Sequence, residues 1–393
     1  MKKKNLVSSF ILSTMAFMPL NADDNILMMF QNAKVSGDVR AISLKLDEKN
    51  AKDSYATAIG GSLKYTLATY NGFGGALSFI TTNDIDALSG SGVEHNQELS
   101  GRDGEYNQVD ESYISYKYDQ FLFKFGRQRL ETPLADSDDI RMVANSFNAY
   151  TAYYADDSFN VVLGHIKKWQ GSDAGLDENW MKTGEDGVHF IGVSFEDGSL
   201  TAQGWYYNFD GLNNSLYLEV SNNYNIDKDN AINIAGQYLN QEEQDNSNIS
   251  AEIFGVNIQS VVNGVDIALA YNKANKKKAK QSFSGYGGGT LFTNMDSMIL
   301  DEITYDREVD AIVATLGYSF EKFDLSYAYG DFSGDTNSFG VKAHIVEQNI
   351  VIGHKHNENL SVEAVYVIDS NEEFSSSSEF NNNSFRVTVD YSF

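Results

Sequence analysis

Residues 126–150 read GRQRLETPLADSDDIRMVANSFNAY, a stretch that combines arginines with carboxylates at close spacing. Opposite charges that face each other across a narrow water-filled passage select permeating solutes by field and by size. The stretch also contains apolar side chains, which a loop folded into such a passage could bury against its wall. The alternative is an exposed loop whose charges are solvated. On the first interpretation the constriction residues are Arg127, Arg129, Glu131, Asp136, Asp138, Asp139 and Arg141.

The aspartates of this stretch suit a second kind of chemistry, because oxygen ligands gathered in one loop can hold a hard cation such as calcium. Asp136, Asp138 and Asp139 lack the spacing of an EF-hand loop. We therefore expect no cofactor and no metal ion, and keep a structural calcium ion at these three residues as an alternative.

Other residues could also do chemistry, but their patterns are weaker. His354 and His356 share one strand face and could bind a metal or form an interfacial pair. The glycines at 287–289 lack the Gly-Lys-Ser/Thr that follows in a phosphate-binding loop, which favours a flexible loop. A Ser-His dyad of the phospholipase type has no local signature here. The sequence therefore predicts no catalytic residue.

The elements that would position this loop are strands with two unlike faces. Segments of about ten alternating residues recur along the chain, which is typical of a transmembrane β-barrel. Residues 35–46 change phase and residues 249–261 are apolar on both faces, so strand boundaries are less certain there. The last segment alternates strictly, with Phe385, Val387, Val389, Tyr391 and Phe393 on one face and Arg386 and Asp390 on the other.

The lengths of the connections predict the number of strands. From Lys34 onward, eight tight turns alternate with nine mostly longer polar loops, which makes seventeen connections and eighteen strands. Bacterial barrels have an even strand number with short turns on the periplasmic side. We therefore predict an all-β transmembrane antiparallel barrel of about 18 strands, or sixteen if one hairpin is split wrongly. Its third long loop, residues 130–147, folds inward as the constriction loop.

The start of the chain predicts export. Three lysines at positions 2–4 precede a mostly apolar stretch, and Leu-Asn-Ala at 20–22 approximates a cleavage site, so residues 1–22 are read as a signal peptide. Residues 23–393 then form a single barrel domain, without cysteine and with one proline. Removing three lysines takes the formal charge from −26 to −29, which disfavours nucleic acid as a partner.

On a barrel, charged residues of the inner faces line the lumen, and the last strand must close onto the first because every backbone polar group in lipid needs a partner. Tyr391 and Phe393 then lie in the interfacial aromatic belt. A terminal phenylalanine after alternating apolar residues also resembles the signal that the outer-membrane assembly machinery recognises. The predicted lumen wall includes Glu111, Lys117, Lys124, Glu363, Arg386 and Asp390.

Three stretches carry a resemblance to a known family. The run 126–150 resembles the constriction-loop region of the OprD-like porins, and more closely the branch of Campylobacter relatives that includes the Campylobacter major outer-membrane porin. Residues 285–298 (GYGGGTLFTNMDSM) are similar to a glycine-rich loop of that branch, and residues 30–40 to its entry into the first strand. The resemblance implies an 18-stranded barrel, commonly trimeric, that passes small hydrophilic solutes or ions. With seven arginines the chain lacks an arginine ladder, so basic amino-acid specificity is not expected.

Together these observations predict a porin in the outer membrane of a Gram-negative bacterium, not an enzyme. It would pass small hydrophilic solutes and ions by diffusion with a mild preference for cations. The expected partners are outer-membrane lipid and lipopolysaccharide, the assembly machinery and two further copies of the chain in a homotrimer. The alternatives are an outer-membrane hydrolase of the phospholipase type and a non-conducting adhesin or structural barrel.

Overall fold

A computed structural model describes residues 26–49, 52–85, 94–178, 180–227, 229–371 and 382–393. The expected signal peptide, residues 1–22, lies outside these residues. No helix in the described part of the chain is long and apolar enough to cross a membrane.

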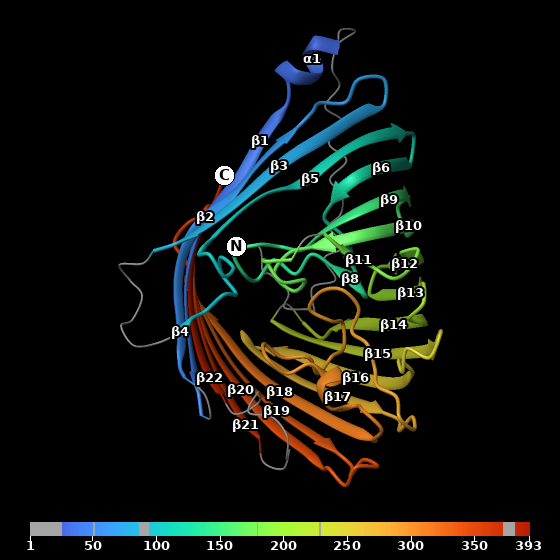
Figure 1. The fold of residues 1–393 in the computed structure, drawn as a ribbon, viewed down its shortest axis with the longest axis vertical. Helices are drawn as coiled ribbons and strands as arrows, with labels where there is room; N and C mark the ends of the chain where they lie inside the picture. Colours follow the sequence, from blue (N-terminus) through green and yellow to red (C-terminus); the bar gives the residue numbers. More distant parts are fainter. Residues whose placement is uncertain (1–25, 50–51, 86–93, 179, 228, 372–381) are drawn as a thin grey trace.

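The described residues form eighteen long antiparallel strands that surround a central space (Figure 1). A short helix α1 (Ile26–Gln31) precedes them. The long strands are β1 (Lys34–Glu48), β2 (Ser54–Thr66), β3 (Phe73–Asp84), β5 (Glu105–Tyr118), β6 (Phe121–Gln128), β9 (Ser146–Ala155), β10 (Phe159–Gln170), β12 (Val188–Asp197), β13 (Leu200–Phe209), β14 (Asn213–Asn225), β15 (Asn230–Glu243), β16 (Ala251–Val262), β17 (Val265–Ala274), β18 (Val309–Phe320), β19 (Phe323–Gly334), β20 (Ala343–Lys355), β21 (Leu360–Asn371) and β22 (Asn382–Ser392). The barrel predicted from the sequence is confirmed.

The barrel closes where the last strand meets the first. β22 pairs antiparallel with β1, with Val39 opposite Tyr391. Phe393 completes the seam: its N–H donates to the Gly37 carbonyl over 3.0 Å, and the Gly37 N–H donates back over 3.1 Å. Closure gives the edge groups of both strands partners, as a lipid environment requires.

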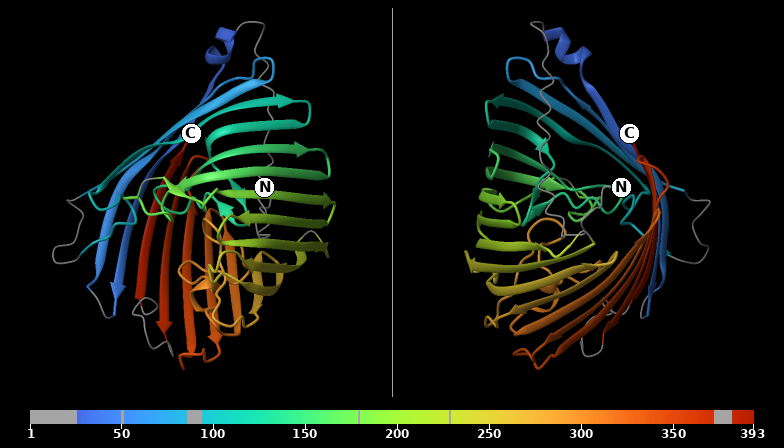
Figure 2. Two further views of the ribbon diagram at one scale, coloured as in Figure 1. Left: turned by 45° about the vertical axis from the view of Figure 1, so that its right-hand side comes forward. Right: turned by 180° about the vertical axis from the view of Figure 1, so that it is seen from behind.

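Short turns and long loops alternate around the barrel as the sequence predicted, so the long loops share one end. Two of them lie inside the ring of strands, namely 129–145 between β6 and β9 and 275–308 between β17 and β18 (Figures 1 and 2). The loops contain β4 (Glu94–His95), β7 (Glu131–Thr132), β8 (Ala135–Asp136), β11 (Met181–Lys182) and a 3₁₀ helix η2 (Leu300–Ile303).

The two faces of the strands differ as the alternation requires. On β22 the Phe385, Val389 and Tyr391 side chains are exposed on the outer face, whereas Arg386 on the inner face is 7% exposed. Similar rows of exposed apolar side chains occur on the outer faces of the other strands, for example Phe323, Leu325 and Tyr327 on β19. The outside of the barrel is therefore an apolar surface suited to lipid.

The irregular stretches of the sequence reflect apolar side chains that point inward. In β1, Ile42 and Leu44 are buried in one cluster with Leu99, from the connection between β3 and β5, and Met142 of the loop between β6 and β9, without any change of register with β2. In β16, Ile253 belongs to a second interior cluster that packs against loop 275–308. Packing against loops inside the barrel therefore explains the change of phase at residues 35–46 and the apolar residues on both faces of residues 249–261.

Candidate functional site

The loop between β6 and β9 folds into the barrel as a small hairpin, which we call the constriction loop (residues 129–145). Its tip is the β7–β8 pair, in which Glu131 lies opposite Asp136. Its base is closed by two hydrogen bonds, from the Ser137 N–H to the Leu130 carbonyl over 2.8 Å and from the Leu130 N–H to Ser137 Oγ over 3.0 Å. Leu134 at the tip is 1% exposed, and its N–H donates to the Tyr207 hydroxyl of the wall. The apolar residues of this loop are thus buried against the barrel.

The glycine-rich segment of loop 275–308 pairs with the tip of the constriction loop. The Asp136 N–H donates to the Tyr286 carbonyl over 2.8 Å, and the Tyr286 N–H donates to the Leu134 carbonyl over 3.0 Å. A Cβ at Gly285 would lie 2.3 Å from the Leu134 oxygen, and one at Gly287 would lie 2.5 Å from the Asp136 oxygen. Both glycines also have positive φ, +89° and +128°. The sequence favoured a flexible loop here, whereas the structure shows a segment paired with its neighbour.

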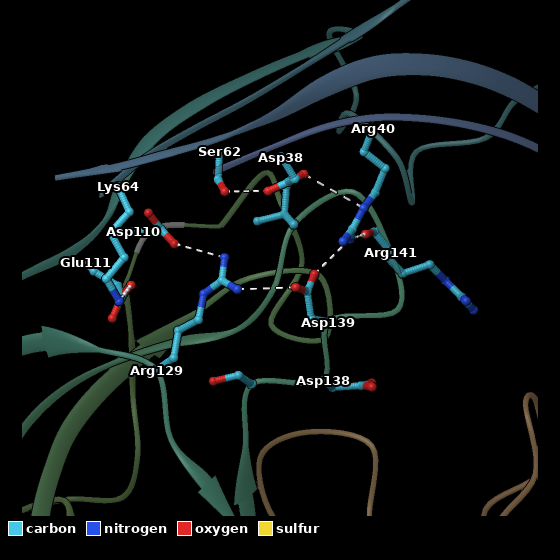
Figure 3. Close-up of polar contacts among 12 residues, drawn as sticks. Asp38, Arg40, Ser62, Lys64, Asp110, Glu111, Arg129, Asp138, Asp139 and Arg141 are labelled. Carbon is cyan, nitrogen blue, oxygen red and sulfur yellow. Dashed lines mark hydrogen bonds and ion pairs between the residues drawn. The ribbon is translucent and has the colours of Figure 1, made fainter. Parts of the chain in front are cut away.

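Arg40 of β1 ties the constriction loop to the seam of the barrel (Figure 3). Its Nη1 lies 2.7 Å from Asp139 Oδ1 and donates to the Arg141 carbonyl over 2.6 Å, and its Nε lies 2.8 Å from Asp390 Oδ2. Asp38 lies next to it, with its carboxylate 3.9 Å from Nε. One guanidinium therefore joins the loop to both strands that close the barrel.

Arg129 holds the same aspartate from the other side. Its Nη1 lies 3.2 Å from Asp139 Oδ2, and its Nη2 lies 3.2 Å from the buried Asp110 of β5 (Figure 3). Burial would raise the pKa of Asp139, but its ion pairs with Arg40 and Arg129 outweigh burial and hold the pKa below its usual value. Asp139 therefore stays ionised and serves as an anchor.

A bulge in β5 explains why two successive carboxylates enter the lumen. The pairing with β3 passes from Glu111 directly to Val109, so Asp110 has no partner in the ladder. Asp110 and Glu111 are 1% and 4% exposed, and both point inward because the extra residue shifts the alternation. Glu111 pairs with Lys64 of β2 over 2.5 Å. Lys124 of β6 lies 5.0 Å from the centre of the Tyr113 ring.

Loop 275–308 is anchored to β20 and to β22, the seam strand that Arg40 also contacts. Its Asp296 carboxylate lies 3.1 Å from Arg386 Nη1 of β22 and 3.8 Å from Arg141 Nη1 of the constriction loop. The Asp296 and Met298 N–H groups donate to the Glu347 carboxylate of β20 over 3.0 and 2.6 Å. The two interior loops are thus joined to each other and to the wall.

A cavity of about 1670 Å³ runs alongside the two loops to the turn between β9 and β10. The described residues that line it include ten carboxylates and four cationic side chains, the latter being Lys64, Lys124, Arg129 and Arg141. Apolar groups of both loops, among them Ile140 and Leu291, form part of the same lining. The cavity surface therefore carries an excess of acidic groups.

Two acidic groups of the loop have a raised pKa. Burial and the neighbouring Asp136 carboxylate raise the pKa of Glu131 to about 7. Burial, together with Asp173 and Asp136, raises the pKa of Asp138 to about 6. Asp138 also has a positive φ of 38°, and its N–H donates to Asp136 Oδ1. The charge of the cavity therefore depends on pH in the neutral range.

The predicted constriction residues do not all lie together. Those that line the cavity are Arg129, Glu131, Asp136, Asp138 and Arg141, and Asp139 lies beside them in the ion-pair network. Arg127 is apart: alternation places it on the other face of β6 from Lys124 and Gln128, with its guanidinium 4.7 Å from the Trp180 ring.

The predicted wall residues also divide into groups. Glu111 and Lys124 line the cavity, whereas Arg386 and Asp390 belong to the ion-pair network. Lys117 and Glu363 lie on inner strand faces toward the end with the short turns. Tyr391 and Phe393, the predicted assembly signal, lie on the outer face at the seam, with ring centres 6.5 Å apart.

Several residues of the site were not predicted. Arg40 and Lys64 sit on inner faces within strands that read as barrel wall, and Asp296 lies in a loop far along the chain. A signal for Asp110 was available: without a bulge, one of two adjacent acidic residues in the middle of a membrane strand would face lipid.

The described residues contain no group of three or more His, Asp or Glu side chains arranged to hold a metal ion. Of the three aspartates considered for calcium, Asp139 is engaged by two arginines. Calcium binding by Asp136, Asp138 and Asp139 stays the alternative to the expected absence of a metal ion.

Solved structures with the same architecture include a porin and an outer-membrane protein of bacteria. OccAB2 of Acinetobacter baumannii superposes with a TM-score of 0.81 at 14% identity, over 93% of this chain and 98% of that one. The BenF-like porin of Pseudomonas fluorescens gives 0.81 at 12% identity, over 93% and 99%. OpdK of Pseudomonas aeruginosa, solved with vanillate, gives 0.79 at 15% identity, over 93% and 99%.

The chain has the fold of these porins. No protein-family model and no curated protein matches the sequence. The resemblance to OprD-like porins that the sequence suggested is therefore confirmed at the level of the fold, across nearly the whole length of the neighbours.

Proposed function

We propose that the protein is a porin of a Gram-negative outer membrane, through which small hydrophilic solutes and ions pass by diffusion with a mild preference for cations. The observation that carries the proposal is the closed barrel that encloses a cavity of about 1670 Å³, whose lining includes ten carboxylates and four cationic side chains beside apolar groups. A water-filled lumen with an apolar exterior is the arrangement of bacterial diffusion barrels. The porin fold of the similar structures supports the same assignment.

The constriction loop and loop 275–308 would set the width of the passage. Their mutual hydrogen bonds through Tyr286 and their ion pairs to Arg40 and Arg386 hold them inside the barrel. Cationic and acidic side chains both line the cavity, for example Lys124 and Asp138. A solute that passes between them meets opposite charges at short range, which orders water and selects by size and dipole.

The expected cation preference follows from the lining of the cavity. Ten carboxylates face four cationic side chains there. The preference is mild because Glu131 and Asp138, with pKa values of about 7 and about 6, are partly protonated near neutral pH. Exposed charges farther from the passage matter little, because a Debye length is about 10 Å at 0.1 M salt.

Liposome swelling tests the proposal directly. Vesicles that contain the purified protein should swell in isotonic solutions of small sugars and amino acids, at rates that fall steeply with solute size. Vesicles that do not swell would indicate a non-conducting adhesin or structural barrel. Release of fatty acid from phospholipid by the same preparation would instead favour the hydrolase. Cross-linking in membranes tests the homotrimer that we also propose.

A further inference from the structure

Five basic side chains gather on the outer surface of the barrel at the end that carries the long loops. They come from three neighbouring strands, and we call them the cationic rim: His165, Lys167 and Lys168 of β10, Lys182 of β11 and His189 of β12. On a chain with a net charge of −26, such a group on one outer face is unexpected.

A bulge turns both lysines of β10 outward. The pairing of β10 with β9 is interrupted between Ile166 and Lys168. Ile166 and Trp169 on either side are 0% and 7% exposed and point inward, whereas Lys167 and Lys168 are both exposed. The extra residue allows two successive side chains to share the outer face.

Like groups oppose each other across the strands of the rim. Lys168 lies directly opposite Lys182 in the β10–β11 pair. His165 lies opposite His189, with ring centres 4.2 Å apart. Like charges directly opposite each other destabilise a sheet. An anion that lies against Lys168 and Lys182 would therefore stabilise this pair.

Among the described carboxylates, Asp186 is close enough to act on His165, but none pairs with a rim lysine. Lys167 lies 5.2 Å from the centre of the Tyr150 ring, and within the described chain none of the three rim lysines forms an ion pair. Other lysines at the same end of the barrel are paired: Lys273 with Glu308 over 2.7 Å and Lys280 with Glu243 over 2.6 Å.

The position of the rim along the strands, relative to the apolar band, indicates which anion could reach it. The outer faces of β10 and β12 carry exposed Leu163 and Ile191, and the neighbouring β9 carries exposed Tyr150 opposite His165. Because a strand rises about 3.3 Å per residue, Lys167 lies roughly 13 Å along the strand beyond Leu163. The lysines therefore lie just past the apolar band, at the level of lipid headgroups on the side of the long loops.

We propose that the cationic rim binds the phosphate groups of lipopolysaccharide in the outer leaflet. This rests on the proposed outer-membrane location, where the long-loop end faces the leaflet that contains this lipid. Lysine ammonium groups donate to phosphate oxygens, and clustered basic side chains at a membrane surface recognise phosphorylated headgroups. The phosphates relieve the repulsion between Lys168 and Lys182.

Binding of lipid A to the detergent-solubilised protein tests the proposal. The triple variant Lys167→Gln, Lys168→Gln, Lys182→Gln should bind bisphosphorylated lipid A roughly 100-fold more weakly than the native protein, since each lysine near an anionic surface contributes about fivefold. Dephosphorylated lipid A should bind the native protein and the variant alike. Inorganic phosphate should compete only weakly, because it lacks the acyl chains that hold the lipid against the apolar band.

Two further variants make the test specific. Replacing three paired lysines, Lys45, Lys273 and Lys280, by Gln changes the net charge equally and should leave lipid A binding within twofold of native. The triple Lys→Arg variant of the rim should retain binding. Three outcomes would overturn the proposal. The paired-lysine variant could lose as much lipid A affinity as the rim variant, the Lys→Gln rim variant could keep native affinity, or its only change could be in oligomer size. Conductance in bilayers free of lipopolysaccharide is independent of the rim, so failure of the channel function would be seen separately.

Discussion

Asp138→Asn removes one acidic charge from the cavity without touching an ion pair. Asp138 lines the cavity, and its nearest charged neighbours include the carboxylates of Asp173 and Asp136. With a pKa of about 6, Asp138 is mostly ionised above pH 7. Asparagine has nearly the same shape, so the passage should keep its width and lose only the charge.

The expected change in selectivity can be worked from Coulomb's law. A unit charge about 5 Å from a permeating ion in a water-like lumen contributes roughly 0.8 kcal/mol, which screening at 0.1 M salt reduces to roughly 0.5 kcal/mol. That energy changes the occupancy of a monovalent ion about twofold, in opposite directions for cations and anions. The cation-to-anion permeability ratio should therefore fall about fivefold at 0.1 M salt, and less than about twofold at 1 M, where the Debye length is about 3 Å.

The zero-current potential of single channels in a potassium chloride gradient at pH 7.5 measures this ratio. Asp335→Asn is the matched control, because Asp335 is exposed in the loop between β19 and β20 and does not line the cavity. A native permeability ratio in Asp138→Asn, or an equal shift in the control, would show that this part of the loop does not face the permeating ion.

Four further outcomes are expected. Cation preference should rise as pH increases from 5 to 8, because the carboxyls of Asp138 and Glu131 are neutral below their pKa values of about 6 and about 7 and negative above them; zero-current potentials against pH would show it. Asp139→Asn removes the shared partner of two arginines and should increase open-channel current noise. Gly287→Val should widen the distribution of single-channel conductances, because its Cβ would lie 2.5 Å from a loop carbonyl. Deleting Phe393 removes the last hydrogen bonds of the seam and should lower the yield of heat-modifiable protein in membranes.

Each of these outcomes has a matched comparison. Glu131→Gln should flatten the upper part of the pH profile, and a profile unchanged by it would contradict the raised pKa. Gly236→Ala is the control for the glycine variant, because its nearest heavy atom would lie 3.9 Å from the added Cβ. Unchanged noise in Asp139→Asn would show that the arginines do not anchor the loop. Unchanged yield without Phe393 would show that the seam forms without it.

The barrel could be predicted from the sequence because lipid imposes a local rule on every strand. A membrane strand must present apolar side chains outward at every second position, and its turns must be short on one side. Those constraints act within about twenty residues, so the alternation and the connection lengths were sufficient to predict all eighteen strands. Where the rule was broken, at Ile42 and Ile253, the cause was packing against distant loops.

The site was only partly predictable because its contacts join distant parts of the chain. The pairing of Arg40 with Asp390 depends on the register of the closing seam, and the entry of Asp110 into the lumen depends on a bulge. The contact between Asp136 and Tyr286 depends on where two loops meet inside the barrel. The composition of residues 126–150 indicated the charged constriction loop correctly. Arg127, however, belongs to β6, where the alternation directs it to the face opposite Lys124 and Gln128.

A planar-bilayer recording of the purified protein in a tenfold potassium chloride gradient tests the central claim most directly. The proposed porin should insert in discrete steps of conductance, and its zero-current potential should have the sign of a moderately cation-preferring channel. Insertion without current would contradict the proposed open lumen. A zero-current potential on the anion side would contradict the assignment of the acidic cavity as the path of permeation.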